Sequence, residues 1–490
     1  MRRPLCLGLR AHDRRRSPAD LYGACLARLL VPLALAAVLG AGLARGEALG
    51  QEPPADQPDD ETAVASLPDD PTWLELQDRV SQLRGLAILC DVPRVLLDPP
   101  AFRARQAAIY RAYLEQEDVA SARAMMVGLG LLDPSQDLAS TLINLRGALP
   151  IGMYDPATGT MYVRSPSDDD PLEQVILAHE FTHALQDQHY HLADLFPRPS
   201  DDPDRDLALT TLIEGDALIV QEMYRNTTLP AEPEAAAAQQ EAQQRALEQV
   251  QRDVSAAVDL DQVPQPVLQE VYFPYLDGPH FIYSVIGSGP LTTWGAYGPA
   301  MANLFANPPR SSSEILHPEK YLRGQRPRRV ELPDLPAALG GGWRLLRRSV
   351  LGELGHQLLL ARYLPGTRPR DATAGWAGNR TAVLADDDGD IITVSETRWD
   401  TPEAAAEWAD AYAAWVEARY GASAQLVWSE QGRLIWQIPA GALAFETRGD
   451  RTLAASGPTV ELVDRVADVL LADPAPGLPA ILSSLAAGLR

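Results

Sequence analysis

The sequence predicts an α+β fold in two domains: a mostly helical domain with a small sheet, then a smaller α+β domain. Three observations support this prediction. The 490 residues exceed the usual size of one domain. Apolar residues recur at helical spacing through residues 71–149, and short alternating stretches appear after residue 375. We expect the first domain to span residues 71–370 and the second to span residues 371–490.

The charge of the chain limits its partners. The formal net charge is −24, and the first 48 residues hold eight arginines against three acidic residues. The rest of the chain is therefore more acidic still. Binding to nucleic acid depends on clustered positive charge. We expect no nucleic acid partner.

Residues 1–48 have the order of a secretory signal peptide, with a basic start, an apolar run at residues 29–44 and small residues after it. The apolar run is just shorter than the roughly 17–25 residues that span a bilayer. This favours cleavage over an uncleaved N-terminal membrane anchor, in which residues 29–44 would be the membrane tether. Either outcome predicts a secreted or extracytoplasmic protein. Residues 49–70, rich in proline and acidic residues, predict a disordered linker.

Within the first domain, residues 71–149 predict helices. The turn Asp-Pro-Ala-Thr-Gly at residues 155–159 separates two β-prone flanks, 151–154 and 160–165, and predicts a β-hairpin. Asp170 then has the features of an N-cap, with proline and an acidic residue after it. This start predicts a helix that runs to about residue 195.

The rest of the chain carries weaker patterns. A second helix is expected over residues 206–224. Residues 265–325 mix aromatic residues, glycine and proline, which predicts short helices. In the second domain, Thr401 is expected to cap a helix with a stripe of aromatic residues at helical spacing, and we assign this stripe to the core.

The segment His179-Glu180-Phe181-Thr182-His183 carries the chemistry of a metal site. Histidines four residues apart lie on one face of a helix, so His179 and His183 can hold one ion. Glu180 lies beside the first ligand, where it can accept a proton from water without occupying the metal. The pattern also arises by chance. Here its neighbours are uncharged, as a buried helix requires.

At this point the sequence resembles a family. Ile-Leu-Ala-His-Glu-Phe-Thr-His-Ala-Leu is similar to the active-site helix of zincin metallopeptidases, and Glu214-Gly215-Asp216-Ala217 is similar to the E-G-x-A segment of gluzincins. The resemblance covers roughly residues 150–225 and implies a zincin-like catalytic domain that binds Zn²⁺. It implies that Glu214 is the third ligand. The small Gly215 and Ala217 would let the second helix approach the first closely.

Several assignments stay open. His189 has the spacing of a third metzincin ligand, but Gln186 stands where that family needs glycine, so we favour Glu214. Asp216 is either an acceptor that orients a ligand imidazole or a surface acid. Four residues are candidates for stabilising an oxyanion: His280, Tyr283, His317 and Tyr321, of which we favour the last two.

The strand at residues 160–165 occupies, in chain order, the place of the zincin edge strand that borders the cleft. It either pairs with an extended substrate or is a plain structural hairpin. We expect a zinc metallopeptidase, a metalloendopeptidase that acts on a protein or peptide substrate. The alternative is a non-proteolytic binding protein that is stabilised by zinc on the same scaffold. The sequence does not indicate an oligomeric state.

Overall fold

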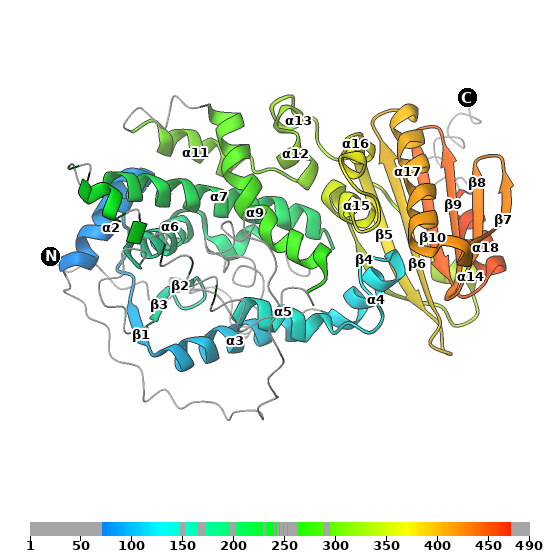
Figure 1. Ribbon diagram of the computed structural model, residues 1–490, viewed down its shortest axis with the longest axis horizontal. Coiled ribbons are helices and arrows are strands. Elements are labelled where there is room, and N and C mark those ends of the chain that lie inside the picture. The colour runs from blue at the N-terminus through cyan, green and yellow to red at the C-terminus, as the bar shows by residue number, and fades with distance from the viewer. Residues whose placement is uncertain are drawn as a thin grey trace, which may run out of the picture. The chain divides into compact units, whose positions relative to one another are not determined.

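The computed structural model describes residues 71–471, apart from residue 117 and residues 148–151, 165–172, 197–200, most of 229–262, and 288–294. This part of the chain is α+β, as predicted (Figure 1). The predicted leader, membrane tether and linker lie outside the described residues. Among the helices that are described, none combines the length and the apolar character needed to cross a membrane.

The described residues form two compact units. The first holds residues 71–119, 135–200 and 204–325, and the second holds residues 120–134, 201–203 and 326–471. The second unit begins before the expected limit at residue 371, because strand β4 (Arg344–Ser349) pairs with β5 (Trp376–Ala385) and so belongs to the C-terminal sheet. The helical spacing in residues 71–149 predicts helices there, but it carries no information on which core each helix joins.

The first unit is mostly helical, with one small sheet. Its helices before the metal-site motif confirm the predicted character of this stretch, except that a strand, β1 (Arg94–Leu97), interrupts them. The helices of the unit whose bounds are described are α2 (Pro71–Arg84), α3 (Pro99–Gln116), α5 (Leu138–Gly147), α6 (Glu173–Tyr190), α7 (Pro203–Thr227), α9 (Gln265–Ile286), α11 (Tyr297–Ala306), α12 (Ser312–Leu316) and α13 (Pro318–Leu322). A short 3₁₀ helix (Leu192–Leu195) follows α6.

The predicted hairpin is confirmed, but its position in the sheet is not the expected one. Strands β2 (Gly152–Asp155) and β3 (Thr160–Arg164) pair antiparallel, and β1 adds in parallel to the far side of β3. The order β1-β3-β2 makes β3 the central strand. Because both sides of β3 are already paired, the prediction that residues 160–165 form an edge strand for a substrate is wrong.

Helices α6 and α7 carry the predicted motifs. Residue 170, the expected cap of α6, lies outside the described residues. The helix ends at Tyr190, before the expected residue 195, because His191 adopts a left-handed backbone with φ of 51°. Helix α7 begins at Pro203 with Asp204 and Asp206 in its first turn, where acidic side chains interact favourably with the helix dipole.

Helix α9 corrects the expectation of short helices after residue 265. It runs for 22 residues and keeps Pro274 and Pro279 inside it. Proline normally interrupts a helix because it lacks an N–H and its ring clashes with the preceding turn. Much of α9 is buried, and the free energy gained by packing its apolar side chains outweighs the local cost of the two prolines.

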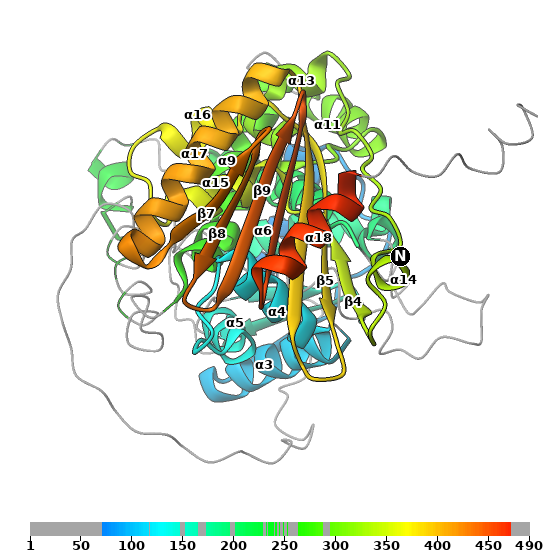
Figure 2. The ribbon, with the colours of Figure 1, turned by 90° about the vertical axis from the view of Figure 1, so that its right-hand side faces the viewer.

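The second unit is built on a seven-stranded antiparallel sheet of order β4-β5-β6-β10-β9-β8-β7. The strands not yet named are β6 (Ile391–Trp399), β7 (Gln425–Glu430), β8 (Arg433–Ile438), β9 (Gly441–Arg448) and β10 (Arg451–Gly457). Its helices are α4 (Val119–Leu129), α14 (Leu335–Leu339), α15 (Gly352–Ala361), α16 (Arg368–Thr373), α17 (Pro402–Tyr420) and α18 (Val460–Leu471). Figure 2 shows α18 lying across one face of this sheet.

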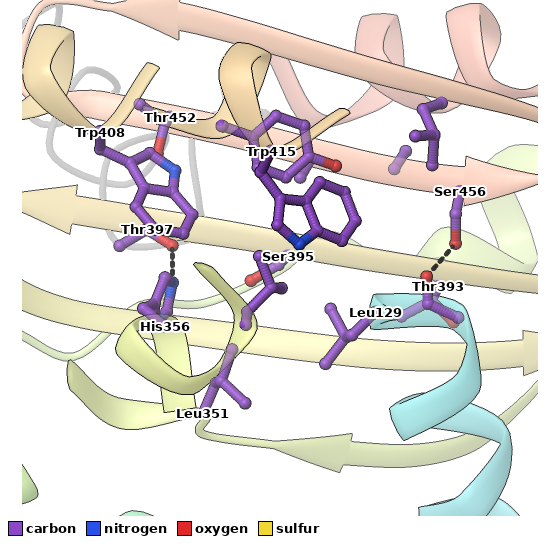
Figure 3. A pocket seen from close by; sticks show the side chains of 16 residues that line it. Leu129, Leu351, His356, Thr393, Ser395, Thr397, Trp408, Trp415, Thr452 and Ser456 are labelled. Carbon is purple, nitrogen blue, oxygen red and sulfur yellow. Dashed lines mark hydrogen bonds between the residues drawn. The ribbon is translucent and has the colours of Figure 1, made fainter. Parts of the chain in front are cut away.

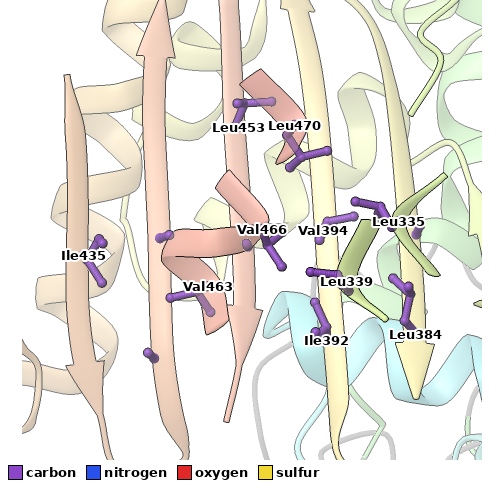
Figure 4. Packing of buried hydrophobic residues seen from close by; sticks show 14 residues of the cluster. Leu335, Leu339, Leu384, Ile392, Val394, Ile435, Leu453, Val463, Val466 and Leu470 are labelled. Atoms are coloured by element: carbon purple, nitrogen blue, oxygen red, sulfur yellow. The ribbon is translucent and has the colours of Figure 1, made fainter. Parts of the chain in front are cut away.

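The two faces of this sheet differ in chemistry. On β6, Ile392 and Val394 point to the α18 side and join a purely apolar cluster with Leu453 and Val466 (Figure 4). On the other side, the aromatic stripe of α17 packs over the sheet. Thr401 caps α17 through its hydroxyl, which accepts from the backbone N of Ala404. Trp408, Tyr412 and Trp415 are all buried, which confirms that the stripe is core.

A small cavity lies under α17, with hydroxyl groups of Thr393, Ser395 and Thr397 along one wall (Figure 3). The Thr393 hydroxyl and the Trp415 indole N–H are buried without a hydrogen-bond partner. The cavity volume is about 30 Å³. That volume suits roughly two water molecules, which would satisfy these polar groups.

Candidate metal centre

Helices α6 and α7 bring three predicted ligands together. His179 Nε2 and His183 Nε2 lie 3.1 Å apart. Glu214 Oε2 lies 3.2 Å from the first of these nitrogens and 3.6 Å from the second. One ligand atom from each residue falls within 4.8 Å of the others, so this group could hold a metal ion.

The burial of these atoms fits a metal ion. His179 and His183 are each 1% exposed, and Glu214 is fully buried. Neither carboxylate oxygen of Glu214 has a hydrogen-bond partner. A buried carboxylate without a donor is costly. A cation between the two imidazoles and this carboxylate would remove that cost.

The electrostatics of the group favour positive charge. Burial lowers the pKa of His183, but the carboxylates of Glu214 and Glu180 outweigh it and raise this pKa to about 9. Burial raises the pKa of Glu214, but the two imidazoles outweigh it and hold the pKa below its usual value. For His179, burial dominates and lowers the pKa. The Glu214 carboxylate therefore stays ionised, and either the imidazolium of His183 or a cation bound between the three residues balances its charge.

A glutamine fixes the tautomer of His183. The Nδ1 atom of His183 lies 2.9 Å from Gln186 Oε1. The amide nitrogen of Gln186 is used elsewhere, because it donates to the Ile213 carbonyl at 3.0 Å and to Asp216 Oδ2 at 2.8 Å. The Gln186 oxygen therefore accepts a hydrogen bond from the Nδ1–H of His183. In the neutral imidazole that binds a metal, Nε2 of His183 then carries the lone pair.

Gln221 has a related place beside His179. It lies on α7 two turns after Glu214, is 2% exposed, and interacts with the His179 side chain. Neither Nδ1 of His179 nor Oε1 of Gln221 has a partner within hydrogen-bond distance. The support for His179 is therefore looser than the support for His183.

Asp216 is a buried acceptor, so the alternative that it is a surface acid is wrong. It accepts from three donors: Gln186, the Arg84 Nε at 2.7 Å, and the Tyr297 hydroxyl at 2.8 Å. Asp216 is connected to His183 by hydrogen bonds through the side chain of Gln186.

Glu180 is held beside the ligands by the small sheet. Its Oε2 accepts a hydrogen bond of 3.0 Å from the backbone N of Tyr154 in β2. Burial raises the pKa of Glu180 to about 8, and the nearby His183 and this N–H only partly oppose the rise. A carboxyl group of this kind can take up and release a proton near neutral pH.

The structure places the other candidates elsewhere. His189 is engaged with the Ala87 carbonyl, 2.7 Å from its Nε2, and is not part of the metal-binding group. The Tyr321 hydroxyl donates to the Asn307 carbonyl, and His317 Nδ1 lies 3.7 Å from Glu319 Oε1. His280 and Tyr283 are exposed on α9. The oxyanion role of His317 and Tyr321 stays a prediction.

Gly215 is needed for a different contact from the one expected. A Cβ at Gly215 would lie 2.5 Å from the backbone carbon of Gly278 in α9. The small residue therefore allows α9, rather than α6, to cross α7 directly beside the ligand Glu214.

Sequence reasoning missed the polar residues that support the ligands. Gln186 was noted only as lacking the glycine of metzincins, and Gln221, Arg84 and Tyr297 gave no signal. Gln186 lies three residues after His183 and Gln221 lies seven after Glu214, so helical spacing places each on the ligand face. That spacing is the one signal that could have found the two glutamines; Arg84 and Tyr297 lie on other helices and have no such signal.

Comparison with known proteins adds one finding. Residues 344–467 match the model of a family described as a domain of unknown function (DUF8575). The match runs from β4 into α18 of the second unit and includes none of the metal-binding residues. No curated protein and no solved structure matches the chain.

Proposed function

We propose that this chain is a zinc-dependent peptidase that hydrolyses peptide bonds in a protein or peptide substrate outside the cytoplasm. His179, His183 and Glu214 are the metal ligands and Glu180 is the general base. The observation that carries the proposal is the convergence of two imidazole nitrogens and an unpartnered carboxylate at one buried point.

The donor set favours zinc over other common metals. Two histidines and one carboxylate are a ligand set of catalytic zinc sites, which leave a further position open. Magnesium and calcium prefer sites made of oxygen ligands. Zinc at this point would supply Lewis-acid polarisation of a carbonyl group and of water.

The chain's own residues supply the proton transfers. Glu180 lies next to a ligand in sequence and is not itself in the metal-binding group. The Tyr154 N–H orients one carboxylate oxygen, so the carboxylate can present the other to an attacking water. Glu180 then accepts the water proton and returns it to the leaving amine. Burial raises the pKa of Glu180, which favours retention of the proton until it passes to the amine.

The test is hydrolysis of casein, an unstructured protein, by the purified chain with and without a zinc chelator. Wild type should cleave casein, the chelator should stop cleavage, and added zinc should restore it. Glu180→Gln should bind zinc as wild type does and cleave at a rate lower by about 10²-fold or more. Equal cleavage by Glu180→Gln, or cleavage that resists the chelator, would refute the proposal.

A second function is favoured by the burial of the site. All four of His179, Glu180, His183 and Glu214 are at most 1% exposed, as a purely structural zinc site would be. In that case the chain is a zinc-stabilised binding protein. It would hold one zinc ion, lose thermal stability when the ion is removed, and show no hydrolysis. The casein assay together with a melting curve in chelator separates the two functions.

A further inference from the structure

We propose that helix α2 is a permanent part of the metal centre and that its last residue, Arg84, positions the ligand His183 through Asp216 and Gln186. This inference rests on the proposed metal site and assigns a role to a segment far from the motif in sequence. It also means that α2 is not a pro-segment that is removed during maturation.

Arg84 is a buried charge with a specific partner. Its side chain is fully buried, and its Nε donates to Asp216 Oδ2 at 2.7 Å. Its guanidinium carbon lies 5.7–5.9 Å from the ring centres of Tyr190, Tyr297 and Phe305. Burial alone lowers the pKa of Arg84, but the Asp216 carboxylate outweighs it. The guanidinium therefore stays charged and neutralises Asp216 in the interior.

The contact chain from Arg84 to the ligand is short. Asp216 Oδ2 accepts from both Arg84 and Gln186, and its Oδ1 accepts from Tyr297. With the amide nitrogen of Gln186 held in this way, its oxygen faces His183 Nδ1. Without Arg84, Asp216 would be a buried charge without a cationic partner. Its side chain would no longer be held in place by the guanidinium, and the amide of Gln186 would lose its fixed orientation.

A second contact ties α2 to the motif itself. Near the start of α2, Trp73 meets Phe181 edge-on, with ring centres 5.6 Å apart. Phe181 stands between the two ligand histidines in sequence, and both rings are buried. Helix α2 therefore supports α6 at Phe181 and the His183 network at Arg84. Loss of residues 71–84 would expose Phe181, which would no longer be covered by Trp73. It would also leave Asp216 without its cationic partner Arg84.

The experiment measures zinc affinity of the full chain by competition with a chromogenic chelator. Three variants are compared with wild type: Arg84→Met, Arg84→Lys and Gln186→Met. Arg79→Ala is the control on the same helix, because Arg79 donates exposed hydrogen bonds to Thr227 and, among the described residues, none to the metal-binding group. Loss of partners beyond the ligands lowers metal affinity by about 10–100-fold in other sites. We expect that loss for Arg84→Met and Gln186→Met, a smaller loss for Arg84→Lys, and none for Arg79→Ala.

Cobalt substitution adds a readout that does not depend on turnover. The visible absorption of Co²⁺ reports ligand geometry and should change in Gln186→Met but not in Arg79→Ala. If Arg84→Met does not fold, the zinc affinity of Gln186→Met tests the inference instead, because this variant leaves the Arg84–Asp216 pair in place. Zinc affinity and a cobalt spectrum equal to wild type in Gln186→Met would overturn the inference while leaving the metal site intact. A wild-type chain that binds no zinc would overturn both.

The N-terminus of the exported protein provides an independent check. Mass spectrometry of the zinc-bound chain should find that it starts at or before residue 71. A zinc-bound mature chain that starts after Arg84 would contradict the proposed role of α2.

Discussion

Both units bury histidine and glutamate side chains, but they treat them differently. In the second unit, His356 is 2% exposed and both of its ring nitrogens are used: Nδ1 lies 2.6 Å from the Gly352 carbonyl and Nε2 lies 3.0 Å from the Thr397 hydroxyl. The buried Glu396 accepts from Arg398 and Arg451. Each of these groups is satisfied by the protein itself.

In the first unit the corresponding groups point at one another. His179 and His183 bring their Nε2 atoms together, and Glu214 approaches both without receiving a hydrogen bond. The difference shows that burial of polar residues does not by itself indicate a ligand site. What distinguishes the metal centre is that its buried lone pairs converge on one point and lack donors.

Removal of one proposed ligand tests this difference between the two units most directly. Glu214→Ala should reduce bound zinc from one ion per chain to almost none, because two imidazoles alone form a weak site. His356→Ala and His189→Ala should keep full zinc content, since the protein already satisfies both rings. Elemental analysis after dialysis measures the content. Zinc loss in His189→Ala and retention in Glu214→Ala would reverse the ligand assignment.

The next largest expected effect is on the rate of hydrolysis, when the proposed general base Glu180 is replaced. Glu180→Gln keeps the shape and the hydrogen bond from Tyr154 N but cannot accept a proton. We expect a fall in kcat of about 10²–10⁴-fold with zinc content unchanged. Single-turnover hydrolysis of a fluorogenic peptide measures it. A rate within threefold of wild type would remove Glu180 from the mechanism.

The satisfied histidine of the second unit predicts a dependence on pH. Burial lowers the pKa of His356 to about 4, while an unfolded histidine titrates near 6.5. Between these values the unfolded chain binds the proton and the native chain does not. Stability is therefore lost as the pH falls from 6.5 to 4, by about 2 kcal/mol at pH 4.5.

His356→Gln should remove this part of the acid sensitivity. The measurement is denaturant unfolding at pH 7 and pH 4.5, followed by tryptophan fluorescence. Seven of the nine tryptophans lie in residues 326–490, so the signal reports mainly the second unit. An equal loss of stability in variant and wild type would show that His356 is not the group responsible.

The smallest expected effect concerns helix packing beside Glu214. In an open helix, replacing glycine by alanine stabilises by about 0.5–1 kcal/mol. At Gly215 the added methyl would meet the backbone of Gly278. We therefore expect a loss of about 1–3 kcal/mol in the stability of the first unit. Ser284→Ala, at an exposed position of α9, should change it by less than 0.5 kcal/mol. A stabilised Gly215→Ala chain would contradict the close crossing of α7 and α9.

The sequence predicted the elements that rest on local chemistry. The hairpin turn at residues 155–159, the Thr401 cap and the helical spacing of His179 and His183 all depend on residues close together in the chain. The strand β1 was missed because four residues give no usable period, and it is defined by pairing with β3 across a long separation. The central place of β3 could not be predicted for the same reason.

The residues that hold the metal ligands in place could not be predicted from the sequence for a related reason. Arg84 comes 132 residues before Asp216, and nothing local to either marks the pair. Asp216 was ambiguous because its place beside Glu214 in the sequence does not show whether its side chain is buried. Only the packing of α2 and α11 around α7 buries it and gives it donors.

The central claim is that one zinc ion is held by two imidazoles and one carboxylate. The most direct test is zinc X-ray absorption spectroscopy on the purified chain, together with its metal content. We predict one zinc per chain, with two imidazole nitrogens and oxygen ligands at about 2.0–2.1 Å and no sulfur. A chain without stoichiometric metal, or a spectrum with fewer than two imidazoles or with a sulfur ligand, would contradict the claim.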